Sequence, residues 1–150
     1  MSKNTDSDFI LRPFADKDYT GLVALKNTLY PDHPTTTDHM QHNDKTYDGK
    51  IKQKRWVYEQ NGEIVVSAMY TQFLEVYHPN KFVIYIHVLS KLQGKGYGAL
   101  SYDFLIKALR PFKPIKITSE INEIHERGIR FLKDRGFIYT LKEQVSKLDL

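Results

Sequence analysis

A short, basic and glycine-rich segment holds the residues whose types and spacing best fit a chemical task. Residues 93–98, QGKGYG, separate an apolar run at 82–89 from a stretch with helical periodicity that ends near Arg110. The first turn of a helix has main-chain N–H groups without an intrahelical partner, and the helix dipole places partial positive charge there. Glycine permits positive φ and lets an anion approach without meeting a Cβ atom. Because Lys95 adds a full charge, the segment predicts a seat for phosphate or pyrophosphate.

The glycine spacing disfavours two common nucleotide-binding folds. The order here is G-x-G-x-G after a predicted hairpin, whereas a dinucleotide-binding fold has G-x-G-x-x-G within a parallel βαβ unit. A Walker loop ends in Gly-Lys-Ser/Thr, which this segment lacks. An ordinary strand-to-helix turn, which uses glycine for geometry alone, stays open as the alternative to an anion site.

Composition limits the function classes. A chain of 150 residues predicts a single domain over 1–150, long enough to bury a core without covalent links. The absence of cysteine excludes disulfides, thiolate zinc sites and cysteine nucleophiles. No stretch has the pattern of a secretory signal or of a membrane helix, so we expect a cytoplasmic protein without a membrane partner. The net charge of +4 suits an anionic ligand, but the scattered basic residues do not indicate nucleic-acid binding.

Three histidines fall close together, at His33, His39 and His42. A metal site would need acidic or thiolate ligands at matching spacing, and the sequence around them does not offer such a set. We therefore expect surface histidines and no metal.

Hydrophobic periodicity and turn residues place the elements that must position the glycine segment. Before it we expect a strand at 9–14 ended by Pro13, a helix from an N-cap at Asp16 to Tyr30, a weaker helix from 35–37 to about Tyr47, and strands at 55–60, from Glu63 to about Val76, and at 82–89. Asn61-Gly62 is a strong hairpin signal, so these three strands form an antiparallel meander. After the segment we expect a helix to Arg110, a strand at 115–119, a helix ending at Arg135-Gly136, and strands at 137–140 and 144–150. The predicted fold class is α/β (α+β), with a mixed, mostly antiparallel sheet of about seven strands and helices on both faces.

Two motifs at this separation resemble the GNAT superfamily of acyl-CoA N-acetyltransferases. One is Gln/Arg-x-x-Gly-x-Gly/Ala, opening an amphipathic helix after a hairpin strand, at residues 93–98. The other is a helix that ends in Gly-Phe before a strand, at residues 126–137. The order of elements agrees from Phe9 to Leu150.

The resemblance implies acetyl-CoA as cofactor and direct attack of a primary amine, on a small molecule or peptide, on the thioester. The central strand would splay from its neighbour at 115–119, and this cleft would take the pantetheine arm. Backbone groups of Val88 and Leu89 would face the thioester carbonyl and the pantetheine. The pyrophosphate would be held by Gln93, Gly94, Lys95, Gly96, Tyr97, Gly98 and Ala99. The side chain of Tyr97 covers the cofactor or simply packs.

The sequence departs from the family at groups that often catalyse. Ile84 and Tyr85 stand where the family often has Glu or Asp, Leu132 stands where it often has a tyrosine acid, and Glu126 and Gly128 replace the helix asparagine and alanine. We therefore name substitutes on the central strand and at the end of the next one: the catalytic candidates are His87, Glu120 and Tyr85. His87 has a suitable intrinsic pKa for a base and Glu120 could act through water.

Other function classes stay open. The chain could be a non-catalytic acyl-CoA-binding module, one half of a tandem pair, and a homodimer is compatible with the sequence. A nucleic-acid binder is the third alternative and is disfavoured, since it predicts salt-sensitive DNA affinity without CoA binding.

Overall fold

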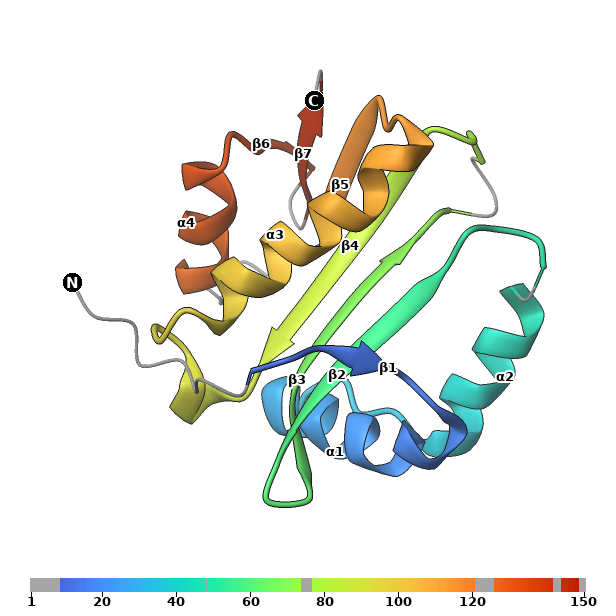
Figure 1. Ribbon diagram of the computed structural model, residues 1–150, viewed down its shortest axis with the longest axis vertical. Helices are drawn as coiled ribbons and strands as arrows, with labels where there is room; N and C mark the ends of the chain where they lie inside the picture. The colour runs from blue at the N-terminus through green and yellow to red at the C-terminus, as the bar shows by residue number, and fades with distance from the viewer. Residues whose placement is uncertain (1–8, 48, 74–76, 121–125, 142–143, 149–150) are drawn as a thin grey trace.

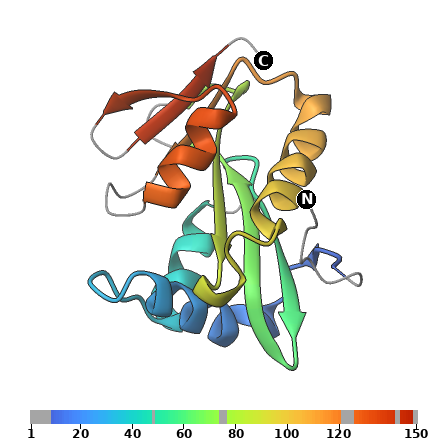
Figure 2. The same cartoon turned by 90° about the vertical axis from the view of Figure 1, so that its left-hand side faces the viewer.

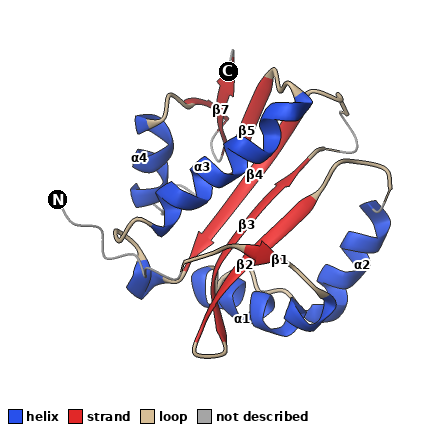
Figure 3. Cartoon of the chain, viewed as in Figure 1, coloured by secondary structure: helices blue, strands red, loops and turns tan. Residues whose placement is uncertain are grey.

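The computed structural model describes residues 9–47, 49–73, 77–120, 126–141 and 144–148. The helices are α1 (Tyr19–Leu29), α2 (Thr37–Tyr47), α3 (Tyr97–Leu109) and α4 (Glu126–Asp134). The strands are β1 (Arg12–Pro13), β2 (Lys54–Gln60), β3 (Glu63–Thr71), β4 (Lys81–Val88), β5 (Lys116–Glu120), β6 (Ile138–Leu141) and β7 (Gln144–Leu148). Short 3-10 turns are η1 (Asp16–Asp18), η2 (Ser90–Leu92) and η3 (Arg110–Phe112). Figures 1 and 3 show these elements.

The strands form one sheet in the order β1-β2-β3-β4-β5-β7-β6. Every neighbouring pair is antiparallel except β4 and β5, which are parallel because α3 carries the chain across between them. The turn Asn61-Gly62 joins β2 to β3 with positive φ at both residues, 52° and 78°, as the hairpin signal predicts. The predicted fold class is confirmed.

Two strands are shorter than predicted. The first strand covers only Arg12–Pro13 within the expected 9–14. The third ends at Thr71, not near Val76, and residues 74–76 lie outside the described part of the chain. The buried side chain of Gln72 accepts a hydrogen bond from the Lys52 main-chain N–H at 2.9 Å and donates to the carbonyls of His78 and Lys81, each at 3.2 Å. These bonds turn the chain out of β3.

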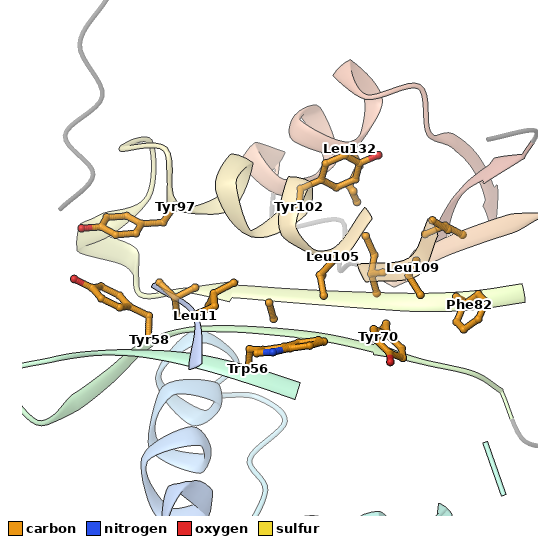
Figure 4. Close-up of a cluster of buried hydrophobic side chains, with 14 of the residues drawn as sticks. Leu11, Trp56, Tyr58, Tyr70, Phe82, Tyr97, Tyr102, Leu105, Leu109 and Leu132 are labelled. Atoms are coloured by element: carbon orange, nitrogen blue, oxygen red, sulfur yellow. The ribbon is translucent and has the colours of Figure 1, made fainter. Parts of the chain in front are cut away.

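The larger hydrophobic core lies between the sheet and α3. Leu105 and Leu109 are fully buried against Phe82 and Ile84 of β4, and burial of each such side chain contributes about 1.5–3 kcal/mol. The cluster fills the space between helix and sheet in Figure 4. Helix α4 packs beside α3, where the rings of Tyr102 and Phe131 meet edge-to-face with centroids 5.9 Å apart.

Helices α1 and α2 cover the opposite face, as Figure 2 shows. A smaller cluster of Leu25, Val57 and Ile64 fills the space beneath α1. A Cβ atom at Gly21 would come within 2.9 Å of Ile64 Cδ1, so glycine permits this close approach of α1 to the sheet. Within the described ranges, no helix has both the length and the apolar character that crossing a bilayer would require.

Candidate functional site

The last half of β4 lies beside an opening in the sheet. Among the residues that the structure describes, four pairs join β4 to β5, from Lys81–Lys116 to Ile84–Ser119, whereas pairing with β3 continues to Val88. The burial of β4 follows this change, because residues 82–84 are buried and 85–88 are partly exposed. Within the described residues, the strand therefore has one unpaired side over its last four residues, beyond the point where its pairing with β5 ends (Figure 1).

The register decides which main-chain groups face this opening. The Leu89 N–H donates to the Val65 carbonyl at 2.8 Å. Because hydrogen-bonding directions alternate along an antiparallel strand, the main-chain groups of Ile86 and Val88 point away from β3, toward the opening. Of the main-chain N–H groups of Val88 and Leu89, only that of Val88 is directed toward the opening, because the Leu89 N–H bonds to Val65 within the sheet.

The glycine segment connects this strand end to α3. Gly94 and Gly96 have φ values of 78° and 98°, a conformation that favours glycine. Gly96 is the N-cap residue of α3, and in the described part of the chain no side-chain capping hydrogen bond is found at this helix start. The first intrahelical bond runs from the Leu100 N–H to the Gly96 carbonyl at 3.1 Å, so the preceding amides, including those of Gly98 and Ala99, have no acceptor inside the helix. An anion fits this donor arrangement.

Two side chains of the glycine segment make contacts within the protein. Gln93 Nε2 donates to the Val88 carbonyl at 2.9 Å and ties the loop to the strand end. Tyr97 is 2% exposed and packs in the core, with its ring centroid 5.1 Å from that of Phe9 and 5.9 Å from that of Tyr58. Of the two roles foreseen for the Tyr97 side chain, packing is the one this geometry supports. Lys95 is partly exposed in the loop.

His87 and Tyr85 share the face of β4 that α1 covers, as alternation along the strand predicts. His87 lies opposite Ser67 of β3, and its Nδ1 is 3.2 Å from Ser67 Oγ. Tyr85 lies opposite Met69. The structure thus places both candidates beside the open half of β4.

The third catalytic candidate, Glu120, and Leu132, at the position of the family's usual tyrosine acid, lie elsewhere. Glu120 is the last residue of β5, which brings its main chain to the far side of the opening, while its side chain lies outside what the structure describes. Leu132 is 4% exposed and belongs to the core, so no hydroxyl occupies the position of the usual tyrosine acid.

Tyr30, which the sequence did not single out, also lies at this site. It follows the last turn of α1, and its ring meets the His87 ring edge-to-face with centroids 5.6 Å apart. Burial raises the pKa of the Tyr30 hydroxyl. The loop after Tyr30 is fixed by the Asn27 side chain, which bonds both the N–H and the carbonyl of Thr35, at 2.8 and 3.0 Å. No local signal predicts the contact between Tyr30 and His87, because these two residues come from distant parts of the sequence.

A separate cavity of about 600 Å³ lies between α2, the start of α1 and β2. Its polar floor is internally satisfied: Asp44 accepts hydrogen bonds from Tyr19 Oη at 2.6 Å and from Arg55 Nη1 at 3.0 Å. Burial and the bond to Asp44 raise the pKa of Tyr19 to about 12. This cavity does not include the candidate residues on β4.

The three clustered histidines of the sequence, His33, His39 and His42, are exposed. In the part of the chain that the structure describes, no three His, Asp or Glu side chains come together as a metal site would require.

Comparison with known proteins now gives the family. The model of the acetyltransferase (GNAT) family matches residues 21–137. An N-acetyltransferase from Staphylococcus aureus superposes with a TM-score of 0.72 at 17% identity, covering 93% of this chain and 97% of that one. A ribosomal-protein-alanine N-acetyltransferase from Brucella melitensis gives 0.71 at 18% identity, covering 94% and 100%.

A Salmonella typhimurium protein solved with its cofactor acetyl-CoA gives a TM-score of 0.71 at 16% identity, covering 93% of this chain and 92% of that one. No curated protein sequence matches the chain significantly. At these identities the structures show the shared fold, and the family model covers most of the chain. The chain belongs to the GNAT acetyltransferase family.

Proposed function

We propose that the chain transfers an acetyl group from acetyl-CoA to a primary amine on a small molecule or peptide. The observation that carries this proposal is the succession of two features: a strand whose pairing with β5, among the described residues, ends at Ile84, and the glycine-rich start of α3 that follows the strand after a short turn. A diphosphate group suits the helix start, and an extended amide-containing arm suits the unpaired strand edge.

Each feature has a proposed counterpart in acetyl-CoA. The main chain of residues 93–99 would bind the diphosphate, with Lys95 adding charge. Gly96 at φ 98° keeps the approach to the first turn of α3 free of a Cβ atom. The Val88 main chain would lie beside the reacting carbonyl. When bound, acetyl-CoA supplies an acetyl group on a thioester, which an amine can attack directly.

The remaining tasks fall to side chains around the open half of β4. A primary amine attacks only when neutral, so a group on the acceptor side must take a proton from it, directly or through water. His87, Tyr85 and Glu120 are the proposed catalytic residues. The negative charge that gathers on the carbonyl oxygen needs a hydrogen-bond donor. The Val88 N–H is the proposed donor, because the register of β4 directs it away from β3.

Calorimetry followed by a thiol-release assay tests the proposal on the full chain. We expect stoichiometric binding of acetyl-CoA and faster release of free CoA thiol with at least one amine of a broad panel. Failure to bind acetyl-CoA would refute the assignment of the loop.

A non-catalytic acyl-CoA-binding module is the second candidate function. It is favoured by two substitutions, because the buried Leu132 and the core residue Ile84 occupy positions where the family often has an acid or a base. Tight binding of acetyl-CoA without thiol release on any amine would support the module over the enzyme.

A further inference from the structure

The side chain of His87 is held from two directions. Ser67 lies directly opposite it on β3, with 3.2 Å between Ser67 Oγ and His87 Nδ1. The ring of Tyr30 stands at 87° to the imidazole on the α1 side. Ser67 is 3% exposed, so water does not compete for its hydroxyl. The imidazole therefore keeps Nδ1 toward β3.

The hydrogen-bond inventory of Ser67 indicates which atom donates. A hydroxyl has one donor hydrogen, and a neutral imidazole has one N–H and one unprotonated nitrogen. In the described part of the chain, the contact with His87 is the hydrogen bond of the Ser67 side chain. If Ser67 only accepted, its buried O–H would lose its partner at a cost of about 1–3 kcal/mol. If Ser67 donates, both atoms are satisfied.

We propose that Ser67 donates its hydroxyl hydrogen to His87 Nδ1 and holds the neutral ring in the tautomer with the proton on Nε2, which makes His87 a hydrogen-bond donor at the open end of β4. Ser67 is then a positioning residue. The role in catalysis rests on the proposed acetyl transfer, whereas the tautomer does not.

The direction of the second nitrogen follows from ring geometry. The two nitrogens of an imidazole point to different sides of the ring, so Nε2 is directed away from β3, toward the side that β5 leaves after Ile84. A donor there suits a carbonyl oxygen that gains negative charge, and a neutral imidazole can fill that role. In this tautomer Nε2 cannot take the proton of the amine, so the base must be another group.

The side chains packed around His87 include two tyrosines. Tyr85 lies on the same strand and Tyr30 at the end of α1, and both share this face of the sheet. The neighbours on β3 are Ser67 and Met69, which do not titrate.

Nitrogen NMR of the free, full-length chain tests the tautomer without any ligand. Long-range ¹⁵N–¹H spectra at about pH 8.5, well above the ordinary histidine pKa of about 6.5, distinguish protonated from unprotonated ring nitrogens. The signals of His87 among the six histidines are assigned by their loss in His87→Gln. We expect an unprotonated Nδ1 and a protonated Nε2 in the wild type and in Ser67→Thr, and a mixture of tautomers in Ser67→Ala. A protonated Nδ1 in the wild type would overturn the proposal.

A pair of variants separates a donor from a base in the transfer reaction. Glutamine places an amide N–H₂ near the position of Nε2 but cannot act as a base, whereas alanine supplies neither function. If His87 donates, His87→Ala should lower kcat by about a hundredfold and His87→Gln by about tenfold, with KM for acetyl-CoA unchanged. Equal loss in both variants would contradict the donor role. If the protein transfers no acetyl group at all, the proposed function fails, while the NMR experiment still decides the tautomer.

Discussion

The starts of α2 and α3 differ in how the main-chain N–H groups of the first helical turn, which lack acceptors within the helix, are satisfied. In α2, Thr36 Oγ1 accepts a hydrogen bond from the His39 N–H at 3.1 Å and caps the helix with its own sequence. In α3 the equivalent position is Gly96, which has no side chain to offer, and among the described residues no capping hydrogen bond from another side chain is found there. A capping side chain contributes about 1 kcal/mol. Helix α3 lacks that stabilisation, and its first turn lies at the proposed diphosphate site.

The start of α1 is a third arrangement on the same face as α2. Asp18 accepts a hydrogen bond from the Ala15 N–H at 2.8 Å and pairs with Arg12 at 2.8 Å. Its carboxylate is thereby committed within the protein. Substitutions at Asp18, Thr36 and Gly96, at the starts of α1, α2 and α3, test this difference between the helix starts.

The largest effect is expected from Gly96→Asp. The new carboxylate would stand in the proposed anion seat and repel a diphosphate, so affinity for acetyl-CoA should fall by roughly a hundredfold or more, about 3 kcal/mol. Calorimetry with acetyl-CoA measures the loss. A side chain at φ 98° also strains the backbone by about 1–3 kcal/mol, so the unfolding free energy should fall as well.

Gly62→Asp is the matched control for that strain. Gly62 has a φ of 78° in the β2–β3 turn, and a Cβ atom there meets nothing within 4 Å. We expect this variant to lose stability without losing acetyl-CoA affinity. Equal affinities for the two variants would show that the loop around Gly96 does not bind the cofactor.

Asp18→Asn should lower stability by about 2 kcal/mol at neutral pH, because it removes the charge from a buried carboxylate that pairs with the partly exposed Arg12. The hydrogen bond from Arg12 holds the pKa of Asp18 below its ordinary value of 3.8. A lowered folded-state pKa contributes stability above the ordinary pKa, and this contribution disappears as the pH falls through the folded value. Urea unfolding at a series of pH values should show the difference between wild type and variant shrinking below about pH 4. A difference that stays constant there would show that the charge of Asp18 is not its cause.

Thr36→Ala should cost about 1 kcal/mol of unfolding free energy through loss of the α2 cap. Acetyl-CoA affinity should not change, because α2 lies on the opposite face of the sheet from α3. Thr36→Ser keeps the capping oxygen and serves as the control. Weakened acetyl-CoA binding in Thr36→Ala alone would contradict the separation of the two helix starts.

The smallest effect is expected from Gly98→Ala. A Cβ atom there would lie 3.8 Å from Phe131 Cε1, which is an ordinary contact, and alanine favours a helix over glycine by about 0.5–1 kcal/mol. Thermal unfolding should therefore show a small gain in stability with acetyl-CoA binding retained, because the donor is the main-chain amide. Large loss of binding would mean that the ligand lies closer to the Gly98 Cα atom than the proposal allows.

Most of the fold was predictable because local signals agree with one another. Asn61 and Gly62 in the hairpin, and Gly94 and Gly96 before α3, adopt positive φ values, which their residue types favour. Both turns were therefore predictable from local sequence. The end of β3 was not predictable, because the buried Gln72 turns the chain through bonds to residues on other segments. The same holds for Tyr97, whose burial depends on the rings of Phe9 and Tyr58.

The candidate site divides in the same way. The positive φ values of Gly94 and Gly96 follow from neighbouring residues and were predictable, as was the common face of Tyr85 and His87, whereas binding of an anion by this segment stays a prediction. Tyr30 and Ser67 reach His87 from other elements, so their contacts depend on the tertiary fold. The side chain of Glu120 is outside the described residues, and its role stays a prediction.

The parallel contact between β4 and β5 has a mechanical consequence. Within the described residues, one pair of strands, β4 and β5, connects strands β1–β4 to strands β5–β7 through four residue pairs, so the backbone ladder between them is short. Apolar side chains join them instead, since Phe82, Ile84 and Ile117 share one buried cluster with Leu105 and Leu109 of α3. Hydrophobic contacts on the α3 face of the sheet therefore hold β4 and β5 together. The ends of these two strands can stay apart while the two parts of the sheet remain joined.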